Sequence, residues 1–134
     1  MNDQIVRART QLLLKRPFFG YLTMFLEPVE DRECPTMGTD GKKLYINPDF
    51  VKPLADSQLQ GVICHEVGHC ALGHLWRRGT RDVIRWNMAA DHAVNALILK
   101  DGLSLPEGNL YDSQFDDMCA EEIYNRIPEA NTML

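Results

Sequence analysis

Apolar residues recur at helical spacing along most of the chain, and Gly or Pro residues separate the runs. A first helix is predicted to end at Arg16, before Pro17, and the aromatic run 18–26 favours a second helix. A capping-box pattern at Ser57 and Gln60 predicts the start of a long central helix. Three further helices are predicted at residues 49–54, 81–100 and 120–126.

Short extended pieces replace the helical pattern between residues 29 and 46. Asp40-Gly41 is a dipeptide preferred in tight hairpin turns, and a predicted strand, residues 43–46, follows it. The sequence therefore predicts an α+β fold that is mostly helical, with a small β-hairpin or sheet packed on the central helix. We expect one domain over residues 1–134, because a chain of this length with 45% hydrophobic residues can bury one core.

The central helix carries His65, Glu66 and His69 in the pattern His-Glu-x-x-His. Residues four apart share one face of a helix, so the two imidazoles can bind the same metal ion. Glu66 lies about 100° round the helix from His65, where it can reach a water on that metal without being a ligand. Hydrolysis of an amide with zinc requires these groups, so the motif predicts a zinc hydrolase with Glu66 as general base.

Catalytic zinc usually has three protein ligands, and the candidates for the third are His74, Asp91 and His92. On a straight helix His74 lies about 180° from His65, so it reaches the ion only if Gly73 ends the helix and turns the chain back. The pattern favours His74 at the helix C-terminus, interacting with the helix dipole. His92 shares its side of the next helix with charged residues, so we expect it to face solvent.

Asp91 is the third ligand that the sequence favours. Asn87, Asp91 and Asn95 form a polar stripe on an otherwise apolar helix face, which is costly to bury unless each group has a partner. We therefore expect Asp91 to bind zinc together with the two motif histidines, and Asn95 to hydrogen-bond a ligating histidine and fix its tautomer. The alternative is a buried polar network without a metal.

Two further segments have candidate roles with a substrate. Many zinc peptidases pair the extended substrate with an edge strand near the metal, and Leu44, Tyr45 and Ile46 form the candidate strand. The alternative is a hairpin that only covers the core. Tyr111, in the irregular segment 103–114, is a candidate hydrogen-bond donor to the oxyanion, although an ordinary packed tyrosine has the same pattern.

Six motifs of the chain resemble those of the bacterial and phage "putative metallopeptidase domain" family. They are Pro17-Phe18-Phe19-Gly20-Tyr21, Thr39-Asp40-Gly41, Leu44-Tyr45-x-Asn47-Pro48-x-Phe50, the run from His65 to His74, Trp86-Asn87-x-Ala89-Ala90-Asp91 and Ala120-Glu121-Glu122-Ile123-Tyr124. The resemblance covers about Leu12 to Ile127. It implies a zincin-like fold, a metal ion, and a peptide or protein as substrate.

The same resemblance implies a partner domain, and the chain departs from related peptidases at one residue, Asn95. In the family this domain often precedes a von Willebrand A-like domain, so such a domain or protein is an expected partner. Because the chain ends at Leu134, we expect a stand-alone form or a fragment. The motif followed by an acid on the next helix is similar to gluzincin and aspzincin peptidases. Asn95 stands where many gluzincins have aspartate, which implies a weaker charge behind the ligating histidine.

Composition narrows the partners and the compartment. The net charge of -5 and a pI near 5.3 argue against nucleic acid or an anionic membrane as a partner. The sequence shows no membrane span, no signal peptide and no C-x-x-C pair among its four cysteines, so we expect a cytoplasmic protein with reduced thiols. Two other hypotheses stay open. One is a catalytically inactive, zinc-stabilised module that binds a partner, and the other is a helical scaffold without metal.

Overall fold

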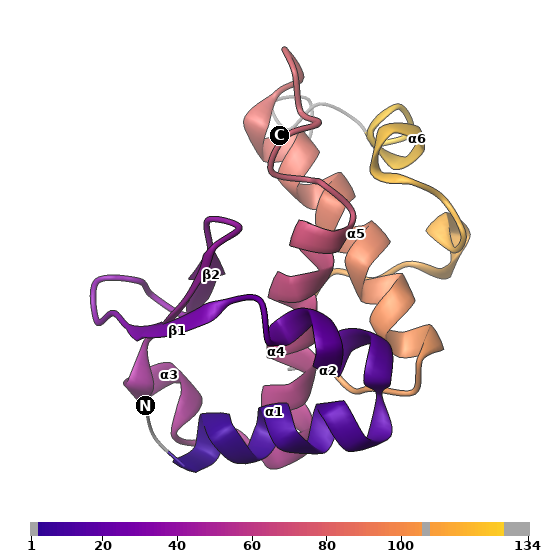
Figure 1. Cartoon of the computed structure of the whole chain (residues 1–134). Helices are drawn as coiled ribbons and strands as arrows, with labels where there is room; N and C mark the ends of the chain where they lie inside the picture. The colour runs from indigo at the N-terminus through magenta and orange to yellow at the C-terminus, as the bar shows by residue number, and fades with distance from the viewer. Residues whose placement is uncertain (1–2, 106–107, 128–134) are drawn as a thin grey trace.

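The computed structural model describes residues 3–105 and 108–127, and in this part the chain has a mixed α+β fold (Figure 1). The predicted α+β class, mostly helical with a small sheet, is therefore confirmed. In chain order the elements are α1 (Asp3–Lys15), α2 (Pro17–Thr23), β1 (Glu27–Glu30), β2 (Met37–Thr39), β3 (Lys43–Ile46), α3 (Pro48–Val51), α4 (Asp56–Ala71), α5 (Val83–Lys100), the 3-10 helix η1 (Ser113–Phe115) and α6 (Ala120–Tyr124).

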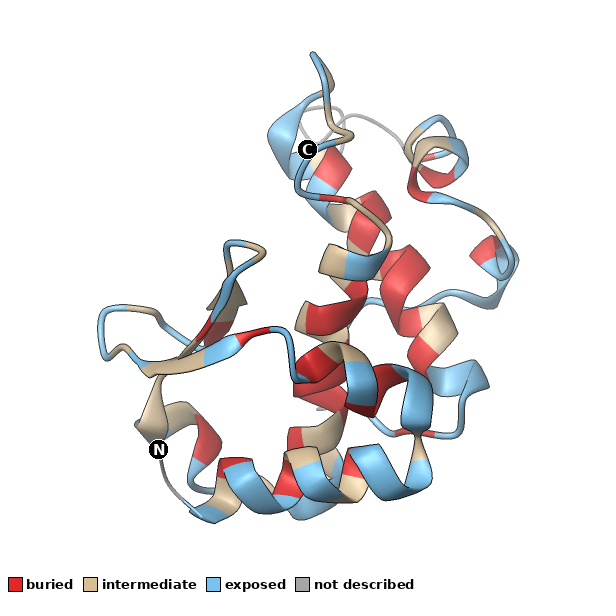
Figure 2. Cartoon of the chain, in the orientation of Figure 1, coloured by how far each residue is buried: buried red, intermediate tan, exposed pale blue. Residues whose placement is uncertain are grey.

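Helices α4 and α5 pack against each other and contain many of the buried residues (Figure 2). On α4 the side chains of Leu59 and Ile63 are fully buried, and on α5 those of Val94 and Ile98 are fully buried as well. These residues belong to one apolar cluster that also includes residues of α1, α2 and the sheet. The two helices that carry the motif and the polar stripe are therefore held by the main core.

The N-terminal helices confirm the prediction from the apolar pattern. Pro17 begins α2 directly after α1, because proline suits the first turn of a helix and cannot continue the one before it. The two helices meet at Gly20, where an added Cβ would lie 2.3 Å from the Cα of Leu13. A glycine at this position lets α2 fold back closely on α1.

The sheet has the strand order β1-β3-β2, in which β3 pairs with β1 in parallel and with β2 in antiparallel. The predicted hairpin is confirmed, since β2 and β3 are joined through Asp40-Gly41 and Gly41 has a φ of +93°. Asp40 Oδ1 accepts hydrogen bonds from the backbone N–H groups of Lys42 and Lys43, at 2.9 and 2.8 Å.

The expectation that Leu44, Tyr45 and Ile46 form an edge strand is wrong. They belong to β3, which is the central strand and has a neighbour on each side. The strand that occupies its second side is β1, with the sequence Glu-Pro-Val-Glu. Because this segment contains a proline and two charged residues, it lacks the alternation of apolar and polar residues that predicts a strand. Proline is nevertheless tolerated in a strand at the edge of a sheet.

The start of α4 also differs from the prediction. The helix begins at Asp56 after Ala55, and the side chain of Gln58 accepts a hydrogen bond from the Ala55 N–H at 3.0 Å. Gln60, predicted to close the capping box, instead donates its side-chain N–H to Gln11 of α1 at 2.6 Å. The side chain of Gln60 therefore forms a tertiary contact with α1 instead of the helix cap that the local pattern predicted.

The other predicted helices are confirmed within a few residues of their ends. Asn47 caps α3 by accepting a hydrogen bond from the Asp49 N–H, and Asp82 caps α5 in the same way through the Arg85 N–H. Gly102, with a φ of +84°, follows the end of α5. No helix among the described residues combines the length and the apolar character that crossing a membrane requires. All four cysteines are free thiols.

Candidate metal centre

Three ligand-type atoms from α4 and α5 meet at one point. His65 Nε2 lies 3.0 Å from His69 Nε2, and Asp91 Oδ1 lies 3.0 Å from the second nitrogen and 3.2 Å from the first. Four ligands arranged tetrahedrally about 2.0–2.1 Å from a zinc ion stand roughly 3.3 Å apart. The observed triangle is close to that size, so these three residues could hold a metal ion.

The tautomer of His65 follows from its contact with Asn95, which is fully buried. Asn95 donates its side-chain N–H to the carbonyl of Leu110 at 2.7 Å, so its Oδ1 is the atom that lies 2.7 Å from His65 Nδ1. An amide oxygen only accepts, so His65 Nδ1 must carry the proton. In a neutral His65, Nε2 is then unprotonated, and its lone pair is directed towards His69 and Asp91. A histidine that binds a metal needs such a lone pair.

The charge of the centre depends on Asp91. Burial opposes ionisation of this carboxyl, but its hydrogen bonds with His65 and His69 outweigh burial and hold its pKa well below the usual range. For His65, burial lowers the pKa, and the contacts with Asp91 and Glu66 raise it by more. An ionised carboxylate beside two imidazoles is a donor set that suits a divalent cation.

His74 lies just beyond the C-terminal end of α4, as the sequence favoured, and its N–H donates to the His69 carbonyl at 3.0 Å. The helix stops at Ala71, and Gly73, with a φ of +70°, turns the chain back. His74 is then 5% exposed, and its Nδ1 lies 3.0 Å from Nδ1 of His69. It contacts the nitrogen of His69 that points away from the other two ligand atoms, so it is not a third ligand.

Burial is the largest influence on His74, followed by its neighbours His69 and Arg77, and together they lower its pKa to about 4. The ring lies edge-on to Trp86, with centroids 5.9 Å apart, and the indole Nε1 donates to the His74 carbonyl at 3.1 Å. His74 is therefore a fixed, neutral partner of His69 near neutral pH. The sequence signal for this arrangement was Gly73, whose conformational freedom allows the turn.

The expectation that His92 faces solvent is wrong. Its side chain is buried, and the ring lies edge-on to Phe115 of η1 with centroids 4.9 Å apart. The segment that contains η1 covers this side of α5, and a helical wheel of α5 alone cannot show such a cover. His92 is not part of the cluster with His65 and His69.

Glu66 lines a cavity of about 240 Å³ together with His65. Its carboxylate has no hydrogen bond or ion pair among the described residues, and burial raises its pKa to about 7. The wall of this cavity also includes Thr36 and Met37 at the start of β2. A carboxyl group with a raised pKa and no partner in a cavity is typical of a general base or acid.

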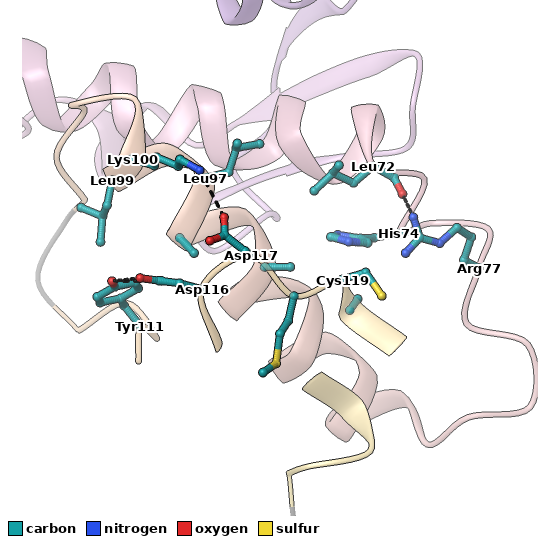
Figure 3. A pocket seen from close by; sticks show the side chains of 14 residues that line it. Leu72, His74, Arg77, Leu97, Leu99, Lys100, Tyr111, Asp116, Asp117 and Cys119 are labelled. Carbon is teal, nitrogen blue, oxygen red and sulfur yellow. Dashed lines mark hydrogen bonds and ion pairs between the residues drawn. The ribbon is translucent and has the colours of Figure 1, made fainter. Parts of the chain in front are cut away.

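The other predicted site residues lie elsewhere. Leu44 and Ile46 point into the core, and Tyr45 donates its hydroxyl proton to Asp40 at 2.8 Å. Tyr111 donates to the carboxylate of Asp116 and lines a second cavity of about 560 Å³, on the side of His74 (Figure 3). None of these residues lines the cavity that contains Glu66.

The family described as "Putative metallopeptidase domain" matches residues 2–133. The chain belongs to this family. The putative metallopeptidase domain thus spans nearly the whole sequence, and the resemblance predicted from the six motifs is confirmed. No curated protein and no solved structure matches the chain significantly. Membership of the family implies a metal ion, and His65, His69 and Asp91 form a cluster that could bind it.

Proposed function

We propose that the protein is a zinc-dependent peptidase of the His-Glu-x-x-His type with a zincin-like active site. One observation carries the proposal: the three ligand-type atoms of His65, His69 and Asp91 converge beside a cavity lined by Glu66, whose carboxylate has no partner in the described part of the chain. A purely structural zinc site has four protein ligands and no use for a base. Three ligands with a base beside them support a catalytic site.

The residues present fit zinc. His65 and His69 would hold the ion through Nε2, and Asp91 would hold it through Oδ1. Two imidazoles and one carboxylate are a ligand set that catalytic zinc uses. A bound zinc ion supplies Lewis acidity, which lowers the pKa of a water molecule and polarises a carbonyl group.

In this proposal Glu66 moves the protons. Its carboxylate accepts a proton from the water that attacks the peptide carbonyl, and it returns that proton to the nitrogen of the leaving amine. A pKa near 7 suits both steps, because the group must take up and release a proton at neutral pH. Apolar neighbours such as Val62 and Met37 limit the access of bulk water to the carboxylate.

Strand β2 replaces β3 as the proposed substrate strand. It pairs with β3 on one side only, and residues at its start line the cavity of Glu66. At its other end Thr39 Oγ1 lies 3.6 Å from Cys70 Sγ on α4. Strand β2 thus lies against the helix that carries the motif, and one of its edges has no neighbouring strand among the described residues, which supports its pairing with an extended peptide.

The register of β2 identifies the backbone groups that would bind the substrate. The Asn47 N–H donates to the Thr36 carbonyl at 3.0 Å, and hydrogen-bonded pairs alternate along an antiparallel ladder. Gly38 therefore faces Tyr45 in a bonded pair, whereas Met37 and Thr39 direct their N–H and C=O groups away from β3. These two residues direct backbone groups towards a peptide, and the Met37 carbonyl also accepts a hydrogen bond from Thr36 Oγ1 at 3.4 Å.

The test is the Glu66→Gln variant, assayed on a mixed peptide library. We expect the variant to retain one zinc ion per chain and to lose hydrolysis by about 10²- to 10⁴-fold, because the amide cannot take up the proton. The control is Gln60→Glu, which changes an amide to a carboxylate on α4 near α1 and away from the cavity. A Glu66→Gln variant as active as the wild type would exclude Glu66 as the base.

A wild type that binds zinc but cleaves no peptide would instead support the module that binds a partner through the same fold. A von Willebrand A-like domain or protein is the partner that the family resemblance suggests for either case. Metal analysis distinguishes both from a scaffold without metal.

A further inference from the structure

The two histidines of the motif have different groups behind them. His65 Nδ1 faces the amide oxygen of Asn95, whereas His69 Nδ1 faces another imidazole, that of His74, at 3.0 Å. The rings of His69 and His74 have centroids 5.2 Å apart. Because the two Nδ1 atoms are only 3.0 Å apart, one of them must carry a proton and donate it in a hydrogen bond that the other accepts.

The direction of this hydrogen bond follows from the ligand role of His69, so the inference depends on the proposed metal site. A neutral His69 that binds a metal through Nε2 keeps its proton on Nδ1. His74 Nδ1 must then be the acceptor, and the proton of His74 must reside on its own Nε2. We propose that His74 is a positioning residue, which holds His69 in the metal-binding tautomer by accepting this hydrogen bond.

The surroundings of His74 keep its ring in place. Trp86 holds the backbone by donating to the His74 carbonyl and packs edge-on against the ring. Arg77 donates to the carbonyl of Leu72, just before the turn, and forms an ion pair with Glu121 of α6. The acceptor is therefore oriented before any metal arrives, as a useful second partner of a metal ligand must be.

The cavity of about 560 Å³ lies against His74 (Figure 3). His74 has no hydrogen-bond partner among the described residues other than His69 and, through its carbonyl, Trp86. The cavity affects the choice of variants. His74→Ala would open the space behind His69 to the cavity and to water, which can replace the lost acceptor. Variants that keep a side chain of similar length give the clearer test.

The experiment compares zinc affinity, measured by competition with a chelator, in His74→Phe and His74→Asn. Phenylalanine keeps a ring against Trp86 but has no acceptor, so we expect zinc binding about 10- to 100-fold weaker than in the wild type. The side-chain oxygen of asparagine can occupy nearly the same position as Nδ1, so His74→Asn should bind zinc within about threefold of the wild type.

His92→Phe is the matched control, because His92 is also a buried histidine in edge contact with an aromatic ring, but its Nδ1 has no hydrogen-bond partner among the residues that the structure describes. Its zinc affinity should equal that of the wild type. Thermal unfolding of each protein without zinc checks that the fold is unchanged. Zinc affinity of His74→Phe within threefold of the wild type would overturn the inference, as would a His74→Asn variant as weak as His74→Phe.

A direct readout uses the wild type alone and covers the case in which His74→Phe does not fold. Nitrogen-15 chemical shifts of the zinc-loaded protein should show a proton on Nδ1 of His69 and none on Nδ1 of His74. The reverse assignment would overturn the inference and leave the proposed hydrolase intact. A wild type that binds no zinc would overturn both.

Discussion

Gly68 of α4 lies so close to Val94 of α5 that an added Cβ would stand 2.8 Å from Val94 Cγ1. The next residue on α4 is His69, and Asp91 lies one turn before Val94 on α5. The close crossing of the two helices at this glycine is what allows His69 Nε2 and Asp91 Oδ1 to approach within 3.0 Å. A packing contact of the core thereby sets the geometry of the candidate metal centre.

Gly68→Ala should therefore weaken zinc binding although it adds only one methyl group. Val94 is fully buried and β-branched, so it cannot turn aside, and overpacking of this kind costs about 1–3 kcal/mol. We expect an affinity for zinc at least tenfold lower. The double variant Gly68→Ala with Val94→Ala should return to within about threefold of Val94→Ala alone, because the clash is gone. Equal affinities of Gly68→Ala and the wild type would contradict this role of the glycine.

Asp91→Ala should lower zinc affinity by more than about 100-fold, a larger effect than loss of an outer partner. The variant removes the only charged member of the cluster and leaves the two imidazole nitrogens facing each other at 3.0 Å. Asn87→Ala, one turn earlier on the same polar stripe and exposed, serves as the control and should bind zinc normally. Full zinc content in Asp91→Ala after dialysis against a weak chelator would show that another residue is the third ligand.

Features with a strong local cause could be predicted from the sequence. The spacing of His65 and His69 on one helix requires only helical geometry, and the polar stripe that contains Asp91 stands out against apolar neighbours. The Asp-Gly turn and the proline that begins α2 are likewise local signals. The structure brings these predicted features together because α4 and α5 are the two helices with the largest buried faces.

Features that depend on distant parts of the chain could not be predicted. His92 is buried by η1, which follows it by about twenty residues, and Gln60 bonds to Gln11 rather than to the start of its own helix. Strand β3 is central because β1 pairs with it, and the proline in β1 made that strand hard to predict from the sequence. The role of His74 depends on one φ angle, that of Gly73, and residue spacing alone does not determine it.

The hairpin turn should resist acid down to about pH 2. Backbone hydrogen bonds from Lys43 and Lys42, and the Tyr45 hydroxyl, lower the pKa of Asp40 to about 2. Because the folded pKa is below the ordinary value, the stabilisation is complete above that value and is lost as the pH falls through about 2. Carbon-13 NMR of the Asp40 carboxyl should report this midpoint, and a midpoint near 4 would contradict the bonds.

The hydrogen bond between Tyr45 and Asp40 should shift the two pKa values in opposite directions, so the titration of Tyr45 is a second test of the same bond. The hydrogen bond to Asp40 raises the pKa of the Tyr45 hydroxyl, so its contribution is present below the ordinary pKa of tyrosine and is lost as the pH rises through the folded value. Asp40→Asn should lower the pKa of Tyr45, measured by NMR, because the amide carries no charge. The pKa of Tyr111, which burial and the hydrogen bond to Asp116 raise, should not change in this variant.

Strand β2 should form backbone hydrogen bonds with every second residue of a peptide substrate. If a peptide pairs with β2, only its alternate N–H groups face the strand, where they meet the outward carbonyl groups of Met37 and Thr39. A cleaved peptide can be remade with a single N-methyl group at each position in turn. Methylation at inward positions removes a donor and places a methyl group against the strand, so kcat/KM should fall by at least tenfold there and change little at the positions between. The untouched positions are an internal control for the flexibility and solubility of the peptide. Uniform tolerance along the peptide would show that the substrate is held by its side chains and that the free edge of β2 has no part in binding it.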